Sequence, residues 1–454
     1  MKVLVLGSGG REHALVWKIA RSPLVSRLWC APGNAGTGGE FLASNGHPVT
    51  NIAIAAESID GLLDFAREHR PDLTVVGPDN PLALGVVDRF QAAGFPIWGP
   101  TQSAARFESS KAFSQAFMER HGVPTARSGV FSDPVAAKAF CRELDGRCAV
   151  KADGLALGKG VLLTTSIADS DKAVDEILVG KAFGSAGENV VIQELLEGPE
   201  ISLHAICDGK TALLFPTSQD HKRALDGDLG LNTGGMGTYS PTPYLDADGL
   251  ASVGRAILDP WLRGCRSEGI DFRGILYPGV MLTREGPKVL EFNARFGDPE
   301  TQVYLTRLQN DLVEVLLASV EGRLDQVQLR WNPDASVCVV MASGGYPGAY
   351  KKGQIIRGLD EAALLPNTKV FHAGTTLHDR EVVTSGGRVL GVTSWGTTLH
   401  EARQNAYKAI GTIQFDGAQW RRDIAAKGLE VHQAKGNATH QPVTGGVSTQ
   451  TTLT

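Results

Sequence analysis

Short apolar runs alternate with amphipathic helical patterns along roughly the first hundred residues of the chain. Strand, helix and strand in series require a parallel sheet with helices on both of its faces. We therefore predict a Rossmann-like α/β domain over residues 1–103. The expected strands are Val3–Leu6, Arg27–Ala31, Leu73–Val76 and Pro96–Trp98, and the expected helices are Ala14–Ala20, Ile59–Arg67 and Leu82–Ala92.

The remaining sequence predicts further domains, because 454 residues are too many for one ordinary domain. Residues 104–325 combine strands with long glycine-rich loops, and such loops are uncommon unless they have a function. Residues 326–429 form a mixed, strand-rich region, and residues 430–454 predict a disordered tail. The expected strands are Cys148–Lys151, Val190–Glu194, Gly274–Leu282, Lys288–Phe292, Val337–Met341, Lys369–His372 and Val389–Val392, with helices at Lys111–His121 and Leu399–Ile413.

Composition and charge exclude several classes of protein. Hydrophobic residues make up 42% and charged residues 20%, and the net charge of −5 provides no basic field for nucleic acid or an anionic membrane. No apolar run approaches the length of a membrane span, and the sequence after Met1 lacks the zones of a secretory signal. The six scattered cysteines predict reduced, mostly buried thiols in a cytoplasmic protein.

The first glycine-rich loop, GSGGREH at residues 7–13, follows a strand and opens a helix. A nicotinamide cofactor is disfavoured, because Glu12 replaces the third glycine of the dinucleotide fingerprint and no acidic residue ends the second strand. The loop still offers backbone N–H groups and the Arg11 guanidinium to a phosphate. The alternative is a turn that needs glycine for its geometry alone. Two more loops, at residues 32–36 and 77–81, should lie at the same sheet edge.

The second glycine-rich loop, KADGLALGKG at residues 151–160, places two lysines beside glycines that allow close backbone approach to phosphates. It lacks the ending and the spacing of a Walker A loop, so an ordinary surface hairpin stays an alternative. The strand VVIQE then leads through a short linker to Glu200. This linker could pair with an adenine edge and Glu200 with ribose hydroxyls, although a solvated turn residue is the simpler reading of Glu200.

The acidic strand KVLEFNARFGDPE at residues 288–300 is the most informative segment. Alternation places Glu291, Asn293 and Arg295 on one face and Leu290 and Phe292 on the other. The carboxylate and amide oxygens suit magnesium, and the guanidinium suits a carboxylate or phosphate. The alternative is a polar strand face in solvent. The segments TSQDHKR and NTGGMG, at residues 217–223 and 232–237, are expected to form a substrate loop nearby.

Together these motifs resemble the phosphoribosylamine–glycine ligase family of the ATP-grasp superfamily, in order, from Met1 to about Lys427. The resemblance rests on VLGSGGREHAL, APGNAGT, VVGPDNPLALGVVD, KADGLALGKGV, TSQDHKR, NTGGMGTYSP, EFNARFGDPETQ, GGYPG and VFHAGT. It implies a pre-ATP-grasp N-terminal domain, a central ATP-grasp domain with a lid subdomain at about 124–190, and a C-terminal domain. It also implies that ATP joins glycine to 5-phosphoribosylamine through glycyl phosphate, in the second step of purine biosynthesis.

The resemblance also implies roles for individual residues. The expected triphosphate contacts are Lys111, Lys151, Gly158 and Lys159, the adenine contacts are Gln193, Glu194 and Leu196, and the ribose carboxylate is Glu200. Glu291 and Asn293 are the expected Mg²⁺ or Mn²⁺ ligands. Gly9, Gly10, Arg11 and Asp79 are expected on the phosphoribosylamine side, and Asp220 and Arg295 facing glycine, with Lys159, Asp220 and Arg295 as the catalytic set. The sequence departs from the family at Ser8, Asp79 and Leu157, and Asp79 in place of Glu shortens a possible ribose contact.

Two other functions compete with this expectation. One is an ATP-grasp ligase or carboxylase with a different acceptor, and the other is a nucleotide-binding regulator without catalysis. Both lysines of the second loop, Glu291 and Asn293 are present, which argues against the regulator. The expected partners are small-molecule substrates only, without nucleic acid or membrane, and the expected assembly is a monomer.

Overall fold

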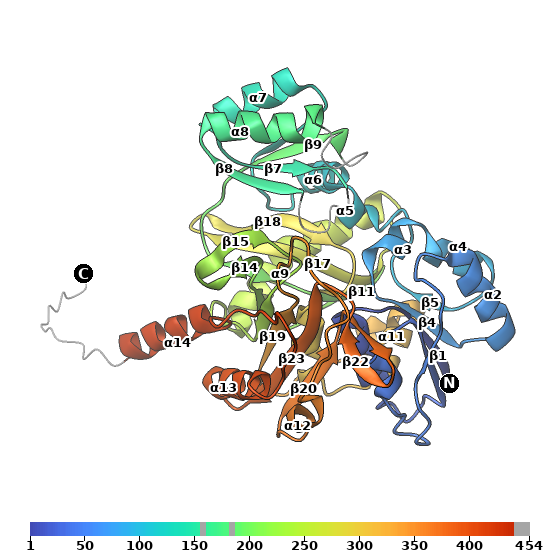
Figure 1. Cartoon of the computed structure of the whole chain (residues 1–454). Coiled ribbons are helices and arrows are strands. Elements are labelled where there is room, and N and C mark those ends of the chain that lie inside the picture. Colours follow the sequence, from blue (N-terminus) through green and yellow to red (C-terminus); the bar gives the residue numbers. More distant parts are fainter. Residues whose placement is uncertain (155–159, 181–186, 440–454) are drawn as a thin grey trace, which may run out of the picture.

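The N-terminal region forms a five-stranded sheet with the order β3-β2-β1-β4-β5. In the computed structural model, which describes residues 1–154, 160–180 and 187–439, all neighbouring strands of this sheet are parallel, as the sequence predicts. Figure 1 shows this sheet in blue, at one side of the molecule. Its elements are β1 (Lys2–Gly7), α1 (Gly10–Ile19), β2 (Arg27–Pro32), η1 (Thr37–Gly39), β3 (Thr50–Asn51), α2 (Ile59–His69), β4 (Leu73–Val76), α3 (Asp79–Ala83), α4 (Val86–Ala92) and β5 (Ile97–Trp98).

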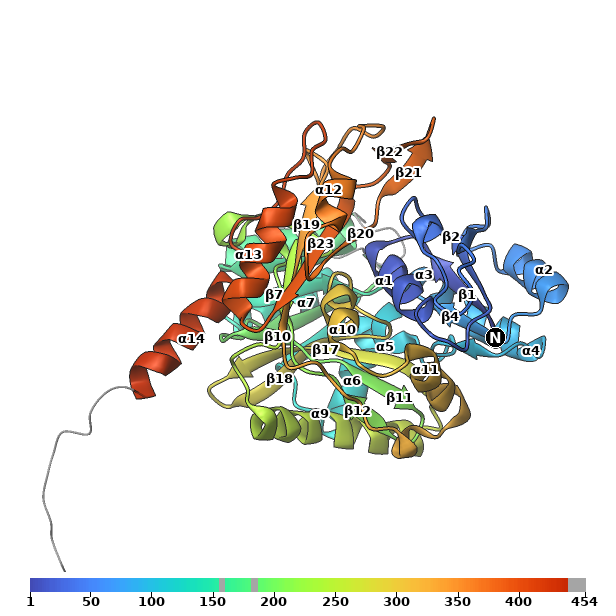
Figure 2. The same ribbon diagram turned by 90° about the horizontal axis from the view of Figure 1, so that it is seen from below.

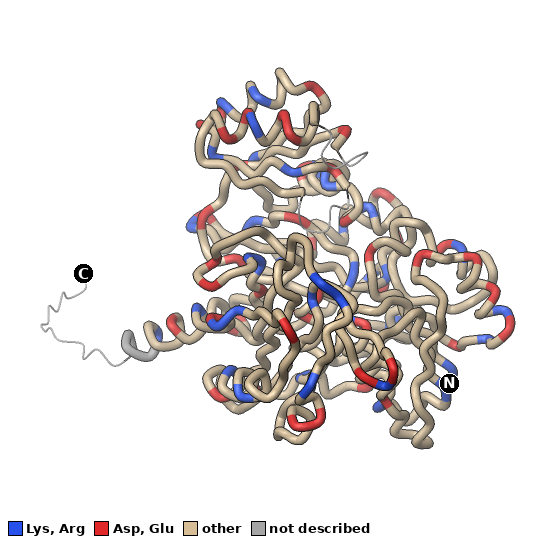
Figure 3. The backbone as a smooth tube through the Cα atoms, viewed as in Figure 1, with Lys and Arg blue, Asp and Glu red and all other residues tan. Residues whose placement is uncertain are grey.

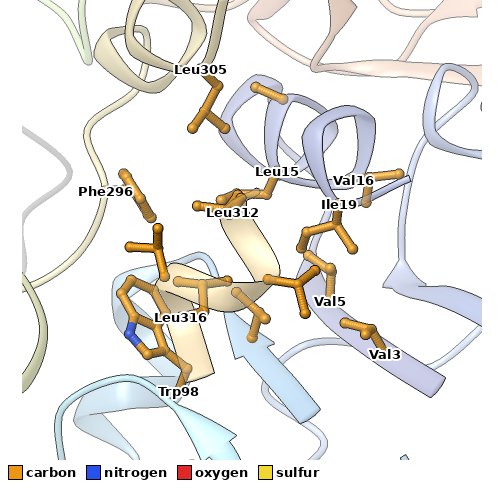
Figure 4. Packing of buried hydrophobic residues seen from close by; sticks show 14 of the residues in the cluster. Val3, Val5, Leu15, Val16, Ile19, Trp98, Phe296, Leu305, Leu312 and Leu316 are labelled. Carbon is orange, nitrogen blue, oxygen red and sulfur yellow. The ribbon is translucent and has the colours of Figure 1, made fainter. Parts of the chain in front are cut away.

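Two hydrophobic cores cover the two faces of this sheet. Helices α2 and α4 pack on one face around Leu4 and Leu6. The other face, which carries Val3 and Val5, packs against α1 and against α11 (Leu312–Glu321), a helix far along the chain (Figure 4). Each large apolar side chain buried in this way contributes about 1.5–3 kcal/mol. The N-terminal sheet is therefore held firmly to the central part of the protein.

One expected helix of this region is divided in the structure. The sequence predicts a single helix over Leu82–Ala92, but α3 ends at Ala83 and α4 begins at Val86. Gly85 lies between them with φ of 82°, a conformation that glycine adopts without steric cost and that ends an α-helix. The first of the two helices, α3, begins at Asp79, directly after the loop that follows β4.

A small subdomain, residues 128–194, forms an antiparallel sheet with the order β6-β9-β7-β8. Helices α7 and α8 cover one face, and Figure 1 shows this unit at the top of the molecule. The preceding helix α6 begins as predicted, because Ser110 caps it and Gly122 ends it in the left-handed conformation. The elements are α5 (Arg106–Ser109), α6 (Lys111–His121), β6 (Ser128–Phe131), α7 (Pro134–Glu143), β7 (Arg147–Ala152), β8 (Val161–Thr165), α8 (Ile167–Val174), the π-helix η2 (Asp175–Val179) and β9 (Val190–Glu194).

The central sheet is antiparallel and is built around the long strand β17, which pairs with β10, β11 and β18. Helices α6 and α9 pack on it in one core, and Figure 2 shows α9 along the outer side. The small subdomain lies above the central sheet in Figure 1. The elements are β10 (Glu200–Ser202), β11 (Ala205–Asp208), β12 (Ala212–Leu214), α9 (Ala247–Ser267), β17 (Arg273–Thr283), β18 (Gly286–Asn293), α10 (Glu300–Arg307) and η5 (Leu324–Gln326).

The C-terminal sheet has the order β13-β16-β19-β23-β20 and is antiparallel. Its strand β13 lies within the first segment predicted as a substrate loop, and β16 begins at the last residue of the second one. The sheet therefore crosses the expected domain boundary at residue 326. Its elements are β13 (Gln219–Asp220), β14 (Arg223–Leu225), η4 (Asp226–Asp228), β15 (Leu229–Asn232), β16 (Gly237–Ser240), β19 (Ala335–Ala342), α12 (Leu359–Ala363), β20 (Thr368–His372), β21 (Thr375–His378), β22 (Glu381–Thr384), β23 (Arg388–Gly396), α13 (Leu399–Ile410) and α14 (Ala426–Thr439).

The predicted start of the disordered tail, at residue 430, is too early in the chain. Residues 430–439 belong to α14, and the Lys435 ammonium donates a hydrogen bond to the Pro243 carbonyl (Figure 1). Composition alone did not show that this polar stretch continues a helix already begun at Ala426. Residues 440–454 lie outside the described part of the chain.

The six cysteines are buried, as the sequence predicts. All six cysteines are buried free thiols, and the Sγ atoms of Cys141 and Cys148 lie 3.8 Å apart in the core of the small subdomain. Within the described residues, no helix combines the length and the apolar character needed to cross a membrane.

Candidate active site

Lysines from three separate elements surround Glu291 between the small subdomain and the central sheet. Lys151, near the end of β7, is 5% exposed, and its Nζ donates to the Leu290 carbonyl at 2.9 Å. Lys222 Nζ lies 2.5 Å from Glu200 Oε1 and 3.9 Å from Glu291 Oε1. Lys111, at the start of α6, donates to the Gly154 carbonyl at 2.9 Å. The predicted ATP contacts Lys111, Lys151 and Glu200 therefore lie close to the predicted metal ligand.

This arrangement controls the charge of the groups involved. Burial alone would raise the pKa of Glu291, but the ammonium groups of Lys222, Lys151 and Lys111 lower it to about 2. Burial lowers the pKa of Lys151 to about 8, despite the opposing effect of Glu291. Figure 3 shows basic and acidic residues interspersed along the chain, so the lysine cluster arises from folding and not from a basic segment.

A bulge in β18 gives Lys151 its hydrogen-bond acceptor. Glu291 pairs with Gly279 and Val289 pairs with Val280, so Leu290 is the extra residue in the strand. The simple alternation predicted from sequence is therefore wrong at Leu290, because Val289 and Phe292 are the residues that enter the core. The carbonyl of Leu290, the residue without a register partner on β17, accepts the Lys151 hydrogen bond.

Gly279 on the central strand leaves space between the two acidic residues. Glu200 on β10 and Glu291 on β18 flank β17 from opposite sides. A Cβ atom at Gly279 would lie 3.6 Å from Glu200 Oε1 and 3.9 Å from Glu291 Cγ. The sheet thus presents both carboxylates on one surface, with Lys222 between them.

Arg295 joins the acidic strand to a carboxylate that the sequence analysis missed. Its Nη2 lies 2.9 Å from Glu108 Oε1, and Glu108 also accepts the Ala294 N–H at 2.8 Å. Arg295 Nη2 lies 3.5 Å from Asn293 Oδ1, which confirms that these two side chains share a face. Burial raises the pKa of Glu108, against the effect of Arg295. The sequence signal was weak, because Glu108 stands alone ahead of the Ser109-Ser110 cap.

The predicted adenine linker lies at the end of β9. Gln193 is buried and its amide donates to Gln115 Oε1 at 2.8 Å. Glu194 Oε1 accepts from the Arg127 N–H at 2.9 Å and lies 3.3 Å from Lys288 Nζ. The side chains of Gln193 and Glu194 are thus engaged within the protein, and the half-buried Leu196 follows β9. Gly158 and Lys159, predicted triphosphate contacts, lie outside the described residues.

Asp220 lies in a buried acidic region next to the site. It accepts a hydrogen bond from Thr238 Oγ1 at 3.2 Å, and burial together with the nearby Glu300 raises its pKa well above the ordinary value. Glu300 Oε1 accepts from the hydroxyls of Tyr277 at 2.6 Å and Ser202 at 3.2 Å. The sequence pattern indicated Asp220 but not Glu300, whose only signal was its place in the motif after Arg295.

The N-terminal glycine loop already contains a carboxylate. Glu12 Oε2 accepts the Gly9 N–H, and Glu12 Oε1 pairs with Arg11 Nε, both at 2.5 Å. A Cβ atom at Gly7 or Gly77 would lie within 2.6 Å of the Glu12 side chain. The carboxylate therefore fills the space that a third glycine would leave open, which supports the argument against a nicotinamide cofactor.

The N-terminal loop also touches the segment that follows the acidic strand. Asp298 Oδ2 accepts the Arg11 N–H at 3.4 Å, next to the start of α1 at Gly10. Arg11 Nη1 and Arg295 Nη1 both donate to the Phe296 carbonyl, at 3.1 and 3.2 Å. The predicted phosphoribosylamine side and the predicted glycine side therefore meet at residues 295–298.

Asp79 lies on the same side of the molecule, at the start of α3. Burial would lower the pKa of Arg295, but the carboxylates of Glu108 and Asp79 raise it. Asp79 also acts with burial to raise the pKa of Glu108. Asp79 and Glu108 share a small surface pocket, which is lined by Asp79, Leu82, Ala83, Ala105, Glu108, Ser109 and Ala294.

The donor set fits a divalent cation that is held partly by a nucleotide. Glu291 and Asn293 offer a carboxylate and an amide oxygen on one strand face. Magnesium takes few protein oxygens and completes its shell with phosphates and water. Within the described ranges, no group of three or more His, Cys, Asp or Glu side chains could hold a metal without such help.

The two antiparallel sheets, with lysines and carboxylates between them, define an ATP-grasp ligase. The same fold occurs in the biotin carboxylase domain of Hydrogenobacter thermophilus 2-oxoglutarate carboxylase, with a TM-score of 0.71, 16% identity and coverage of 95% of this chain and 98% of that one. The sequence matches all three domains of phosphoribosylglycinamide synthetase: the N domain at residues 1–108, the ATP-grasp (A) domain at 109–301 and the C domain at 336–427. The chain belongs to the phosphoribosylamine–glycine ligase family.

Relatives of this family match over nearly the whole chain. The phosphoribosylamine–glycine ligase of Vibrio cholerae is 49% identical over 438 residues, which cover 96% of this chain and all of the relative. That of Escherichia coli O157:H7 is 49% identical over 435 residues, with 95% and 100% coverage. The crystal structure of the Thermotoga maritima enzyme superposes with a TM-score of 0.80 at 34% identity, covering 94% of this chain and 100% of that one.

Proposed function

We propose that this chain joins glycine to 5-phosphoribosylamine with ATP, forming glycinamide ribonucleotide, ADP and phosphate in the second step of de novo purine biosynthesis. The single observation that carries the proposal is the placement of Arg295. Its guanidinium contacts Asn293 of the predicted metal pair and shares the Phe296 carbonyl with Arg11. A clamp for a carboxylate thus adjoins both the nucleotide side and the N-terminal loop.

The nucleotide would lie between the small subdomain and the central sheet. Lys111 and Lys151, with Lys159 and the Gly158 backbone, would contact the triphosphate. The end of β9 at Gln193, Glu194 and Leu196 would receive the adenine, and Glu200 the ribose. The three lysines near Glu291 support this assignment, because their positive charge exceeds what Glu200 and Glu291 balance.

Glu291 and Asn293 would hold a Mg²⁺ or Mn²⁺ ion together with the ATP phosphates. When bound, such an ion neutralises negative charge on the phosphate oxygens. Around it, Lys151 and Lys222 keep Glu291 ionised, and therefore able to act as a ligand, throughout the physiological pH range.

Arg295 would orient the glycine carboxylate toward the γ-phosphorus. A carboxylate oxygen bonds to the γ-phosphorus while the bond from that phosphorus to the β,γ-bridging oxygen breaks, which yields glycyl phosphate and ADP. Catalysis here requires positioning and charge neutralisation by Lys151, Lys159 and Arg295, and no enzyme nucleophile. Closure of the small subdomain, proposed as a lid over residues 124–190, would keep water from the acyl phosphate.

The amine of phosphoribosylamine would then attack the glycyl carbonyl carbon, and phosphate would leave. Gly9, Gly10, Arg11 and Asp79 would form the side of the site that receives this substrate. The attacking nitrogen must lose a proton, and we assign Asp220 as the acceptor, because burial and Glu300 give it an unusual affinity for protons. Asp220 must be ionised to act, so the rate of this step should rise with pH through its raised pKa.

The test is ADP formation measured with each substrate omitted in turn, followed by identification of the product. Sustained ADP release over many turnovers should require both glycine and 5-phosphoribosylamine, because the amine discharges the glycyl phosphate, and glycinamide ribonucleotide should accumulate with the ADP. Other amino acids and bicarbonate are offered in place of glycine. Turnover with one of these, or ATP binding without any turnover, would overturn the proposal.

We also propose the domain boundaries of the chain and its assembly state in the cell. Residues 1–103, 104–325 and 326–429 would form the three domains, with two strands of the central segment completing the C-terminal sheet. The protein would act as a cytoplasmic monomer on small molecules, independently of nucleic acid and membranes. Light scattering at catalytic concentrations tests the monomer, because a dimer would double the measured mass.

A further inference from the structure

Arg388, the first residue of β23, reaches from the C-terminal sheet into two loops of the candidate site. Its Nη1 donates to the carbonyls of Asp298 at 2.6 Å, Gly234 at 2.7 Å and Gly235 at 3.4 Å. Its Nη2 lies 3.4 Å from Asp298 Oδ2, and the side chain is 22% exposed. One guanidinium therefore connects the NTGGMG loop with the loop after the acidic strand.

Each of these loops carries a group on the amine side of the candidate site. A Cβ atom at Gly235 would lie 2.8 Å from Asp220 Oδ1, so the Gly235 backbone lies directly against the Asp220 carboxylate. On the other loop, Asp298 accepts the Arg11 N–H at the start of α1. Arg388 can thus affect the position of both Asp220 and Arg11 without contacting either side chain.

Tyr346, in the GGYPG motif, provides a second link from the C-terminal region to the same loop. Its hydroxyl accepts the Gly234 N–H at 3.3 Å, while Arg388 binds the Gly234 carbonyl. A Cβ atom at Gly387 would lie 2.3 Å from the Tyr346 ring, so the glycine before Arg388 allows the ring to pack there. Both main-chain groups of Gly234 are therefore fixed by side chains of the C-terminal sheet and its loops.

The nucleotide side has a different set of neighbours. The charges that lower the pKa of Glu291 come from Lys222, Lys151, Lys111 and Arg295. Among the described residues, the hydrogen bonds and ion pairs of the Arg388 side chain involve only Gly234, Gly235 and Asp298. Within the described part of the chain, the Arg388 side chain therefore makes no hydrogen bond or ion pair with Glu291, Lys151 or Arg295.

We propose that Arg388 is a positioning residue for the amine-transfer half of the reaction. It holds the Gly234–Gly235 and Asp298 backbones so that Asp220 and the N-terminal loop face the acyl intermediate together. Glycine activation by ATP does not depend on it. This inference rests on the proposed function, and Tyr346 assists by holding the same loop.

Hydroxylamine separates the two halves of the reaction. It attacks glycyl phosphate in place of the amine substrate and releases glycine hydroxamate and phosphate, so hydroxamate formation without phosphoribosylamine reports activation alone. We would measure this rate, and the rate of glycinamide ribonucleotide formation, in the wild type and in Arg388→Met, Arg388→Lys and Tyr346→Phe. Arg422→Met, at an exposed arginine of the same region, is the matched control.

Arg388→Met should form hydroxamate at nearly the wild-type rate but lose about 100-fold in kcat/KM for phosphoribosylamine, since small displacements of substrate-positioning groups can cost that much. Arg388→Lys should recover part of the loss, because it restores the charge without the planar fork. Tyr346→Phe should show a smaller loss of the same kind, and Arg422→Met no loss.

The outcomes distinguish this inference from the proposed function. Wild-type protein without glycine-dependent hydroxamate or ribonucleotide would contradict the proposed function itself. An active wild type with both rates reduced equally in Arg388→Met and Tyr346→Phe would overturn the positioning role. An unchanged rate of glycinamide ribonucleotide formation in Arg388→Met would also overturn the positioning role. Thermal unfolding of each variant checks the fold, and Tyr346→Phe keeps the test valid if Arg388→Met does not fold.

Discussion

The chain contains two strand-to-loop junctions that look alike in sequence, one after β1 and one after β7, and they differ in the charge they face. After β1, the Gly9 N–H and the Arg11 guanidinium bind Glu12, and the Arg11 N–H binds Asp298. After β7, the Lys151 ammonium binds only a neutral carbonyl, that of Leu290, among its hydrogen-bond partners in the described residues.

In the loop after β1, internal carboxylates neutralise the positive charge. The site after β7 keeps an excess of positive charge. Lys111, Lys151 and Lys222 face Glu200 and Glu291 on the nucleotide side. An incoming triphosphate would therefore be attracted there, whereas a phosphate at the N-terminal loop would have to compete with internal carboxylates. A glycine-rich sequence alone predicts that a ligand can approach the backbone closely. The charges beside the loop decide which ligand is attracted.

The strongest test of the nucleotide side removes the proposed metal ligands. Glu291→Gln combined with Asn293→Ala should lower ATP turnover by at least about 100-fold, because the phosphate charge is no longer neutralised. Steady-state ADP release measures this, with circular dichroism to confirm the fold. Near-normal turnover would contradict the metal assignment.

Lys151→Met should lower kcat/KM for ATP by about 100-fold, through loss of a buried charge next to the phosphates. In the wild type this parameter should fall as pH rises above about 8, because the lowered pKa leaves Lys151 uncharged there. The variant should lack this fall. Lys172→Met, at an exposed lysine of α8, is the control. An identical pH profile in wild type and Lys151→Met would exclude Lys151 as its origin.

On the N-terminal side, Arg11→Ala should raise the KM for phosphoribosylamine by about tenfold, the value of one hydrogen bond to a charged group. The KM for ATP should change less, because Arg11 contacts Glu12 and Phe296 and not the lysine cluster. Initial rates with each substrate varied measure both constants. An equal rise in the two would argue against phosphoribosylamine at this loop.

The smallest effect on turnover is expected for Glu12→Gln. The change leaves the Arg11 charge buried without its carboxylate partner, so the free energy of unfolding should fall by about 3 kcal/mol. Turnover at saturating ATP should stay close to wild type. Urea unfolding measures the loss, with the exposed Glu57→Gln as control. An unchanged stability would show that the loop does not depend on its internal carboxylate.

Sequence patterns predicted local structure well where one physical rule acted alone. The strand over Leu73–Val76 and the cap at Ser110 follow from apolar runs and side-chain capping, which depend on near neighbours. The prediction was wrong where a single residue changed the rule. Gly85 divides a predicted helix, and the bulge at Leu290 breaks the alternation of β18.

The sequence by itself determined the order of the elements, the glycine-rich loops and the oxygen-bearing side chains on β18, because these depend on residues close together in the chain. Only the tertiary structure decided which charges meet. Glu108 reaches Arg295, Lys222 lies between Glu200 and Glu291, and Arg388 fixes the loops beside Asp220 and Arg11. Such contacts join segments far apart in sequence, and packing of the sheets, which no local pattern specifies, brings them within hydrogen-bonding distance.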